Sequence, residues 1–171
     1  EIEECGKDPL ENARQKALAY YRICGQPVFS QDSGLYIEGL PKERQPGVHV
    51  RRVNGVNLTD EQMRKYYKKI AAEFGGRCVA QYQNAICLVF SENEIYEARG
   101  GTLNWKKFWL MTEERPQRME GFPLDAICAD YRTGRHFYDG EATMPEEEGD
   151  GVRDFFRNAL KQHEMRMGKW I

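Results

Sequence analysis

The sequence predicts a mixed α/β fold in a single domain. The chain opens with the pattern of a helix followed by a strand, continues through a strand-rich middle and closes with an amphipathic helix. This order of elements is typical of helices packed on a sheet. A length of 171 residues is enough for one domain with its own core. With 40% hydrophobic and 30% charged residues, the composition is that of a soluble globular protein.

Charge and cysteine usage exclude several classes of protein. The formal net charge of -2 provides no basic surface for bulk nucleic-acid binding. No apolar run approaches the roughly 20 residues that cross a bilayer, and the acidic, polar start does not resemble a signal peptide. The five cysteines are scattered and form no CxxC pair, which favours free thiols in a reducing compartment. We therefore expect a cytoplasmic protein without a membrane or nucleic-acid partner.

The first helix is predicted over residues 8–25. Asp8 is the expected N-cap, Pro9 takes the first helical position, and Glu11 at the third position completes a capping box. Apolar residues follow at helical spacing. Gly25 is the expected C-cap, so both ends of this helix are specified locally.

The remaining elements follow from turn residues and periodicity. Residues 27–30 are expected to form a short buried strand and 35–40 a second extended piece, whereas 41–55 has the prolines and glycines of a loop. Thr59 caps a second helix, which is expected to run from residue 60 and to close at two glycines, 75 and 76. Beyond it we expect two strands within 78–101 around a turn at 91–94, a strand within 102–114, short strands and turns over 118–140, an acidic loop over 141–151 and a closing helix over 152–167.

The stretch "SQDSGL" presents Asp32 directly after an apolar run. Open α/β sheets bind ligands at the ends of such strands, and a carboxylate there can hold Mg²⁺ or orient water near a phosphate. Asp-Ser-Gly is also ordinary turn chemistry, so a simple turn remains an alternative. A second metal carboxylate could come from the acidic residues of "EIEECG", which read equally well as a solvated terminus.

Three further residues have both a chemical and a structural interpretation. Lys16 could face a phosphate, or pair at the surface with Glu11, one helical turn away. In "GFPLDA", Phe122 could stack on a base, and the Asp125 carboxylate could accept hydrogen bonds from ring N–H groups. A core phenylalanine and a turn aspartate are the structural alternatives.

Five stretches together resemble the inosine/xanthosine triphosphate pyrophosphatase family, and they occur in the family's order. They are "EECGKDPLENARQKA", "PVFSQDSGLYIEGL", "QPGVHVRRVNG", "AQYQNAICLVF" and "GFPLDAI". The resemblance implies an α/β fold in which helices flank a long mixed sheet bent around a nucleotide cleft, usually in a homodimer. It also implies Mg²⁺-dependent cleavage of the α–β phosphate bond of ITP, dITP or XTP, which gives the monophosphate and pyrophosphate.

The resemblance assigns roles by position. Glu4 and Asp32 match the metal carboxylates, and Asp32 also matches the base that acts on the attacking water. Lys16 matches the helix lysine that faces the phosphates, and Ser33 matches a substrate-contacting serine. Phe122 and Asp125 match the pair that recognises the base.

The sequence departs from the family pattern in four places. Gln31 replaces an acid beside Asp32, and "FPLD" replaces the Phe-Gly-Tyr/Trp-Asp of the base site. The family's N-terminal strand and phosphate loop have no counterpart before Glu1, so either the sequence lacks this segment or part of the triphosphate grip is lost. The late Lys-Asn-x-x-Ser-His-Arg motif is absent, and Arg153 or Arg157 could substitute for its basic contact. These departures leave three hypotheses: a divergent pyrophosphatase, a nucleotide-binding member with weak or no hydrolysis, and an unrelated α/β domain.

Overall fold

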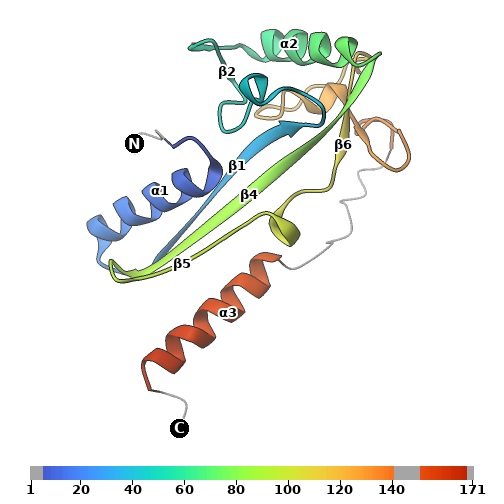
Figure 1. Ribbon diagram of the computed structural model, residues 1–171. Helices are drawn as coiled ribbons and strands as arrows, with labels where there is room; N and C mark the ends of the chain where they lie inside the picture. Colours follow the sequence, from blue (N-terminus) through green and yellow to red (C-terminus); the bar gives the residue numbers. More distant parts are fainter. Residues whose placement is uncertain (1–5, 141–150, 169–171) are drawn as a thin grey trace. The chain divides into compact units, whose positions relative to one another are not determined.

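The computed structural model describes residues 6–140 and 151–168 (Figure 1). Its elements, in chain order, are α1 (Pro9–Cys24), β1 (Val28–Ile37), η1 (Lys42–Arg44), β2 (Arg52–Val53), β3 (Val56–Asn57), α2 (Asp60–Glu73), β4 (Arg77–Ser91), β5 (Glu94–Arg99), η2 (Gly101–Leu103), β6 (Phe108–Met111), η3 (Asp125–Ile127), β7 (Cys128–Asp130) and α3 (Gly151–Arg166). The predicted α/β fold class is confirmed. Of the predicted acidic loop over 141–151, residues 141–150 lie outside the described residues, and Gly151 belongs to α3.

The strands pair in the order β1–β4–β6–β7, with β5 also paired to β4. The pairings of β4 with β5, β4 with β6, β6 with β7 and β2 with β3 are all antiparallel. The turn between β4 and β5 is too short for a parallel crossover, so antiparallel pairing is required there. The chain divides into two compact units, which are described separately below: unit 1 consists of Glu1–Gly34, Gln83–Trp105 and Glu147–Ile171, and unit 2 of Leu35–Tyr82 and Lys106–Glu146.

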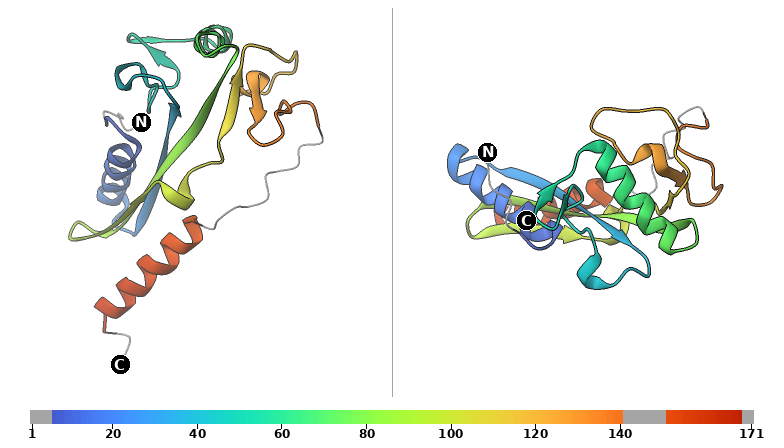
Figure 2. Two further views of the ribbon diagram at one scale, coloured as in Figure 1. Left: turned by 45° about the vertical axis from the view of Figure 1, so that its right-hand side comes forward. Right: turned by 90° about the horizontal axis from the view of Figure 1, so that it is seen from above.

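In unit 1, α1 and α3 cover opposite faces of β4. Alternate residues of a strand point to opposite faces, and β4 uses both. Cys87 and Val89 pack with Ala13 and Ala17 of α1. On the other face, a second buried cluster joins β4 to η2 and α3, and Figure 2 shows the two helices on either side of the strands. The members of this second cluster are Ile86, Leu88, Leu103, Phe155 and Ala159.

The capping residues of α1 act nearly as predicted. The Asp8 side chain accepts hydrogen bonds from the backbone N–H groups of Leu10 and Glu11, and Gly25 takes the left-handed conformation (φ 63°) that ends the helix. The capping box differs in one partner, because the Glu11 carboxylate accepts from the N–H of Lys7 at 2.7 Å. Both helix ends therefore depend on residues within one turn, which is why the sequence could specify them.

In unit 2, α2 packs its buried side chains against the strands. Thr59 and Gln62 form a reciprocal capping box at its start. Tyr67 of this helix is fully buried, and its hydroxyl donates to the Val50 carbonyl at 2.8 Å. The core of unit 2 comprises Leu35, Ile37, Leu40, Met63, Tyr67, Ile70, Ala71, Cys78, Ala80, Phe108, Leu110, Leu124, Ile127 and Cys128.

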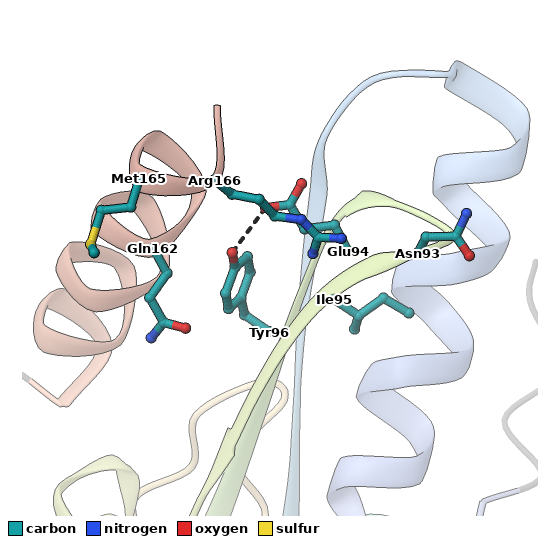
Figure 3. Close-up of a pocket in the computed structure, with 7 residues that line it drawn as sticks. All are labelled: Asn93, Glu94, Ile95, Tyr96, Gln162, Met165 and Arg166. Carbon is teal, nitrogen blue, oxygen red and sulfur yellow. Dashed lines mark hydrogen bonds between the residues drawn. The ribbon is translucent and has the colours of Figure 1, made fainter. Parts of the chain in front are cut away.

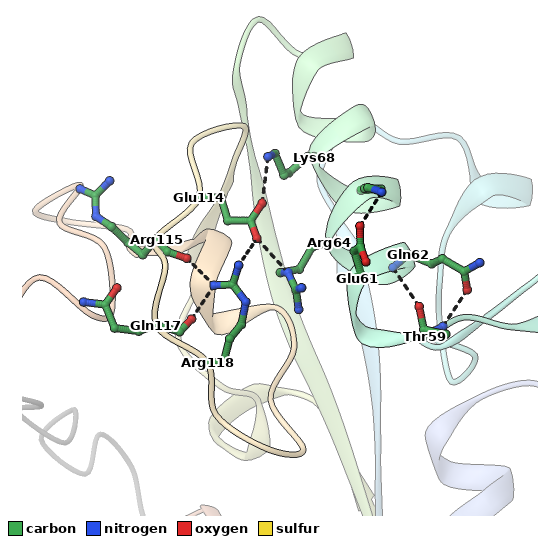
Figure 4. A network of polar contacts seen from close by, with 10 residues as sticks. Thr59, Glu61, Gln62, Arg64, Lys68, Glu114, Arg115, Gln117 and Arg118 are labelled. Carbon is green, nitrogen blue, oxygen red and sulfur yellow. Dashed lines mark hydrogen bonds and ion pairs between the residues drawn. The ribbon is translucent and has the colours of Figure 1, made fainter.

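A charged network joins α2 to the loop after β6 in unit 2. The Glu114 carboxylate accepts from Arg64 at 2.9 Å, from Lys68 at 3.0 Å and from Arg118 (Figure 4). Only 12% of the Arg64 side chain is exposed, so its charge depends on this partner. Glu114 thereby holds the 112–118 loop against α2.

One sequence prediction is wrong: the strand predicted at 27–30 does not end before "QDSG". Residues 28–37 form a single strand, β1, which joins the two extended pieces predicted at 27–30 and 35–40. Asp32 therefore lies within a strand and not just past the end of one. The turn propensity of Asp-Ser-Gly is overridden because the polar side chains of this segment form hydrogen bonds with α1 and β4. These tertiary contacts favour the extended chain.

Two other expectations can be compared with the structure. The expected strand over 102–114 is shorter, because it begins with η2 and only Phe108–Met111 is extended. Cys24, Cys78, Cys87 and Cys128 carry free thiols, as predicted. No helix among residues 6–140 and 151–168 is long and apolar enough to cross a membrane.

Candidate functional site

The candidate site lies in unit 1, where α1 faces β1. The Lys16 ammonium lies 2.9 Å from Asp32 Oδ1 and donates a hydrogen bond to it. The two side chains are 18% and 14% exposed, so the pair is largely buried but reaches solvent. A charge-assisted hydrogen bond in such surroundings fixes the carboxylate more firmly than a surface pair would. Lys16 thus has Asp32 as a partner, which neither interpretation of the sequence named, and its contact with a phosphate remains a prediction.

A second donor on α1 holds the other oxygen of the same carboxylate. Asn12, one helical turn before Lys16, is 2% exposed, and its Nδ2 donates to Asp32 Oδ2 at 3.0 Å. Residues four apart share one face of a helix, so α1 aims both donors at β1. Asp32 is thus held at both oxygens by one helix.

Ser33 points away from this pair. Neighbouring residues of a strand face opposite sides, and the Ser33 hydroxyl lies 2.7 Å from Asn84 Oδ1 on β4. Asn84 is 4% exposed, donates through Nδ2 to the Leu103 carbonyl at 2.6 Å, and belongs to the side of β4 that α3 covers. The structure therefore does not bring Ser33 onto the face that carries Lys16 and Asp32.

The predicted base-recognition pair lies in unit 2. Phe122 is 53% exposed, so it is not the core phenylalanine of the structural alternative. Asp125 begins η3, and burial raises the pKa of its carboxyl group. Within residues 6–140 and 151–168, no side chain or backbone N–H donates a hydrogen bond to this carboxylate. A partly buried acid without a donor is suited to accept hydrogen bonds from a ligand.

The other predicted residues divide as follows. Glu4, the second metal carboxylate, lies outside the described residues. Arg157, a candidate for the late basic contact, is 66% exposed and pairs with Asp154 of the same helix at 2.7 Å. Arg153, the other candidate for the late basic contact, lies in the first turn of α3.

The site's donors are compatible with a hard divalent cation at Asp32. Among the residues that the structure describes, one protein group donates to each oxygen of the Asp32 carboxylate, which keeps further lone-pair capacity and reaches solvent. The part of the chain that the structure describes contains no group of three acidic, histidine or cysteine residues that could hold a metal. A cation such as Mg²⁺ that keeps several waters and shares phosphate oxygens needs only one or two carboxylates, so Asp32 fits this type of site.

Two functional candidates were missed by the sequence analysis, Asn12 and Asn84. Both are buried asparagines inside regular elements, one in a helix and one in a strand. Asparagine is unfavourable in both places, so its occurrence there is the signal that could have revealed them. Their partners lie about 20 or more residues away in sequence and could not be inferred from local pattern.

A cavity of about 370 Å³ lies between the start of β5 and the last turns of α3 in unit 1 (Figure 3). Glu94 accepts hydrogen bonds from the Tyr96 hydroxyl and from His163 Nδ1, each at 2.9 Å. The His163 ring also stacks on Phe90 with 3.9 Å between centroids. These contacts fasten α3 to the β4–β5 hairpin.

Comparison with known proteins identifies the family. A family model described as the Ham1 family matches residues 1–107. The chain belongs to the Ham1 family. The matched residues include Asn12, Lys16 and Asp32, so the candidate site lies within the Ham1 segment.

Relatives and solved structures agree with the Ham1 assignment. A dITP/XTP pyrophosphatase of Brucella melitensis is 31% identical over 160 residues, which are 87% of this chain and 66% of the relative. A dITP/XTP pyrophosphatase of Geobacter sulfurreducens is 43% identical over 61 residues, 36% of this chain and 30% of the relative. The chain thus spans less than two thirds of either relative. A HAM1 protein from Coxiella burnetii has a TM-score of 0.64 at 25% identity, covering 99% of this chain and 81% of that one.

Proposed function

We propose that this Ham1-family chain is a divalent-metal-dependent nucleoside triphosphate pyrophosphatase that acts on non-standard purine nucleotides. The observation that carries the proposal is the Lys16–Asp32 pair, a cation and a carboxylate at the edge of solvent. Relatives named dITP/XTP pyrophosphatases support the substrate class, namely ITP, dITP and XTP. The products are the nucleoside monophosphate and pyrophosphate.

Asp32 and Lys16 have separate roles in the proposed reaction. Asp32 orients a water molecule and accepts its proton as the water oxygen bonds to the α-phosphorus. The bond from the α-phosphorus to the bridging oxygen breaks, and pyrophosphate leaves with that oxygen. Lys16 offsets the negative charge on the phosphates. A bound Mg²⁺ would be held by Asp32 and, outside the described residues, by Glu4, and it supplies charge neutralisation.

Selection of the base rests on Asp125 and Phe122. A 6-oxopurine such as hypoxanthine or xanthine presents an N1–H donor, whereas adenine presents an acceptor at N1. The Asp125 carboxylate, which has no donor among residues 6–140 and 151–168, would accept that hydrogen bond, while Phe122 stacks on the ring. A site that leaves a partly buried carboxylate facing an acceptor rejects adenine nucleotides.

Three finer features complete the proposal. The metal is Mg²⁺, the enzyme works as a homodimer, and it acts in the cytoplasm. The first follows from the oxygen donors at Asp32, and the other two follow the family resemblance and the free thiols.

The test is hydrolysis by the purified chain with Mg²⁺. dITP, XTP, ITP, dATP and dGTP are each incubated with the protein, and nucleotides and pyrophosphate are separated by ion-exchange chromatography. We expect monophosphate and pyrophosphate from at least one of the first three, and none after Asp32→Asn. Asp60→Asn is the matched control, since Asp60 pairs at the surface of unit 2 with Arg51. Free phosphate in place of pyrophosphate would refute the assigned bond cleavage.

A second candidate function is nucleotide binding with weak or no hydrolysis. The observation that favours it is the pair between Arg157 and Asp154, because an arginine engaged within its own helix is a weaker substitute for the family's late basic contact. Saturable binding of ITP without turnover across the five nucleotides would select this alternative. Binding of none of them would exclude both.

A further inference from the structure

Asn12 is the most deeply buried polar side chain of the candidate site. It is 2% exposed, so it does not present a surface to a ligand. Its Oδ1 accepts from the Gly6 N–H at 2.8 Å, and its Nδ2 donates to Asp32 Oδ2 at 3.0 Å. A backbone N–H can only donate, so the amide oxygen must face Gly6 and the amide nitrogen must face Asp32. The orientation of the carboxamide is therefore fixed by its partners.

The space around Asn12 is closed on the Gly6 side. A Cβ atom on Gly6 would lie 2.3 Å from Asn12 Oδ1 and 2.8 Å from the Asn12 backbone nitrogen. No side chain fits there without moving Asn12, since such distances lie well inside van der Waals contact. The Gly6 backbone and the Asp32 carboxylate thus clamp one short, rigid side chain between them.

Lys16 and Asn12 hold Asp32 in different ways. Lysine is a point charge on a flexible stem, whereas the asparagine is neutral, short and buried. When the Lys16 ammonium is drawn to a phosphate, its hold on Asp32 Oδ1 is weakened. The Asn12 bond to Oδ2 is independent of that movement and keeps the carboxylate plane in place.

We infer that Asn12 is a positioning residue, which holds Asp32 in its working orientation for metal and water while Lys16 engages the substrate. The inference rests on the proposed function for the role of Asp32. Partners that orient a ligating carboxylate typically contribute 10- to 100-fold to metal affinity or activity. We expect an effect of about that size from the loss of Asn12.

Two variants disturb the hydrogen bond between Asn12 and Asp32 in different ways. Asn12→Leu removes both hydrogen bonds, while Gly6→Ala displaces the carboxamide and removes no polar group. Gln45→Ala is the matched control in unit 2, because the Gln45 amide also bridges backbone groups, with bonds to Ile37 and Leu40. All four proteins are compared by thermal unfolding, by Mn²⁺ titration followed by electron paramagnetic resonance, and by kcat and KM for dITP.

We expect both site variants to bind Mn²⁺ about 10- to 100-fold more weakly and to lose kcat, with KM for dITP changed less because Lys16 remains. Gln45→Ala should lower the unfolding temperature and leave the Mn²⁺ affinity of the folded protein unchanged. A merely structural role predicts the pattern of Gln45→Ala for all three variants and would overturn the inference.

The outcome is separable from that of the proposed function. If the wild type binds Mn²⁺ and hydrolyses no nucleotide, the proposed function fails and the Mn²⁺ affinities still decide the role of Asn12. If the wild type binds no Mn²⁺, the inference fails as well.

Discussion

Asn84 Oδ1 accepts the hydroxyl proton of Ser33, with 2.7 Å between the two oxygens. The direction of this hydrogen bond is determined by a third group, the Leu103 carbonyl, which can only accept and takes the Asn84 Nδ2–H at 2.6 Å. The amide oxygen must therefore face Ser33. Because its proton is committed to Asn84, Ser33 Oγ presents only lone pairs to a ligand.

The first prediction concerns the group that Ser33 recognises. If Ser33 contacts the substrate, it must meet a hydrogen-bond donor, such as a sugar hydroxyl, and not an ionised phosphate oxygen. Ser33→Ala should raise KM for ITP by up to about 10-fold, the value of one hydrogen bond. It should leave inhibition by inorganic pyrophosphate unchanged. Steady-state kinetics with ITP, dITP and a 3′-deoxy analogue would identify the hydroxyl, and an equal loss of pyrophosphate binding would contradict the prediction.

The second prediction separates the two partners of the ion pair. In Lys16→Met the competing cation at Asp32 is gone, so free Mn²⁺ should bind at least as tightly as to wild type. Nucleotide binding should weaken by about 10-fold or more, because a buried charge-assisted contact to phosphate is worth more than an ordinary hydrogen bond. Calorimetric titration measures both affinities.

The control for this prediction is Lys65→Met. Lys65 pairs with Glu61 at the surface of α2 and is 73% exposed, so its removal should change neither affinity. Parallel losses of Mn²⁺ and nucleotide binding in Lys16→Met would show that the lysine supports the structure of the site and not its ligand.

The third prediction is a pH dependence caused by Asp125. Burial raises the pKa of this carboxyl group, so its ionisation is less favourable in the folded than in the unfolded chain. Its contribution to stability is therefore present below the unfolded pKa and is lost as the pH rises through the folded pKa. Asp125→Asn should unfold at a higher temperature than wild type at pH 7 and at a similar temperature near pH 3.

The same variant should weaken selection of 6-oxopurines, because the amide can present a donor to adenine N1 as well. Thermal unfolding from pH 3 to 7 together with kinetics on dITP and dATP checks both effects. A lower unfolding temperature at pH 7 would mean that a donor compensates the Asp125 charge in the folded protein.

The fourth prediction concerns the attachment of α3 through Glu94. Burial alone would raise the pKa of Glu94, but hydrogen bonds from His163 and Tyr96 outweigh it and hold the pKa below the usual range. The stabilisation from a lowered carboxyl pKa is present above the unfolded pKa and is lost as the pH falls through the folded value. Glu94→Gln should therefore speed amide hydrogen exchange in α3 at pH 7 and have little effect near pH 3.

Asp154→Asn tests whether any charge change in α3 has this effect, since Asp154 pairs with Arg157 in the exposed first turns. Its exchange rates near His163 should match wild type. If α3 is equally protected from hydrogen exchange in Glu94→Gln and in wild type at pH 7, Glu94 does not contribute to the attachment of α3.

The sequence was most informative where structure depends on neighbours in the chain. Both ends of α1 were predicted, because Asp8 and Gly25 act through backbone groups within one turn. The placement of Asp32 just past the end of a strand was wrong, because the partners of Asp32 lie 16 and 20 residues away on another element. Local propensity depends on neighbouring residues and does not include such long-range contacts. The sequence could therefore indicate Asp32 as a candidate and still place it beyond the end of the strand.

The candidate site was predicted in part for the same reason. Lys16 and Asp32 were named from the resemblance, and the structure brings them together. The buried amides of Asn12 and Asn84 were not named, since their importance comes from the groups they bridge across the fold. The roles of Lys16 and Asp32, like those of Ser33, Phe122 and Asp125, remain predictions.

Lys16 and Asp32 also act as counter-ions to one another. On the proposed function, the substrate exchanges ions with this pair: its cation takes the place of the ammonium at Asp32, and a phosphate takes the place of the carboxylate at Lys16. Free metal alone would compete with Lys16 for Asp32, and free phosphate alone would compete with Asp32 for Lys16, so either one breaks a largely buried ion pair and replaces only one of its two contacts. On the proposed function, a nucleotide that arrives with its cation replaces both counter-charges in one event, so we expect the metal–nucleotide complex to bind more tightly than either component alone.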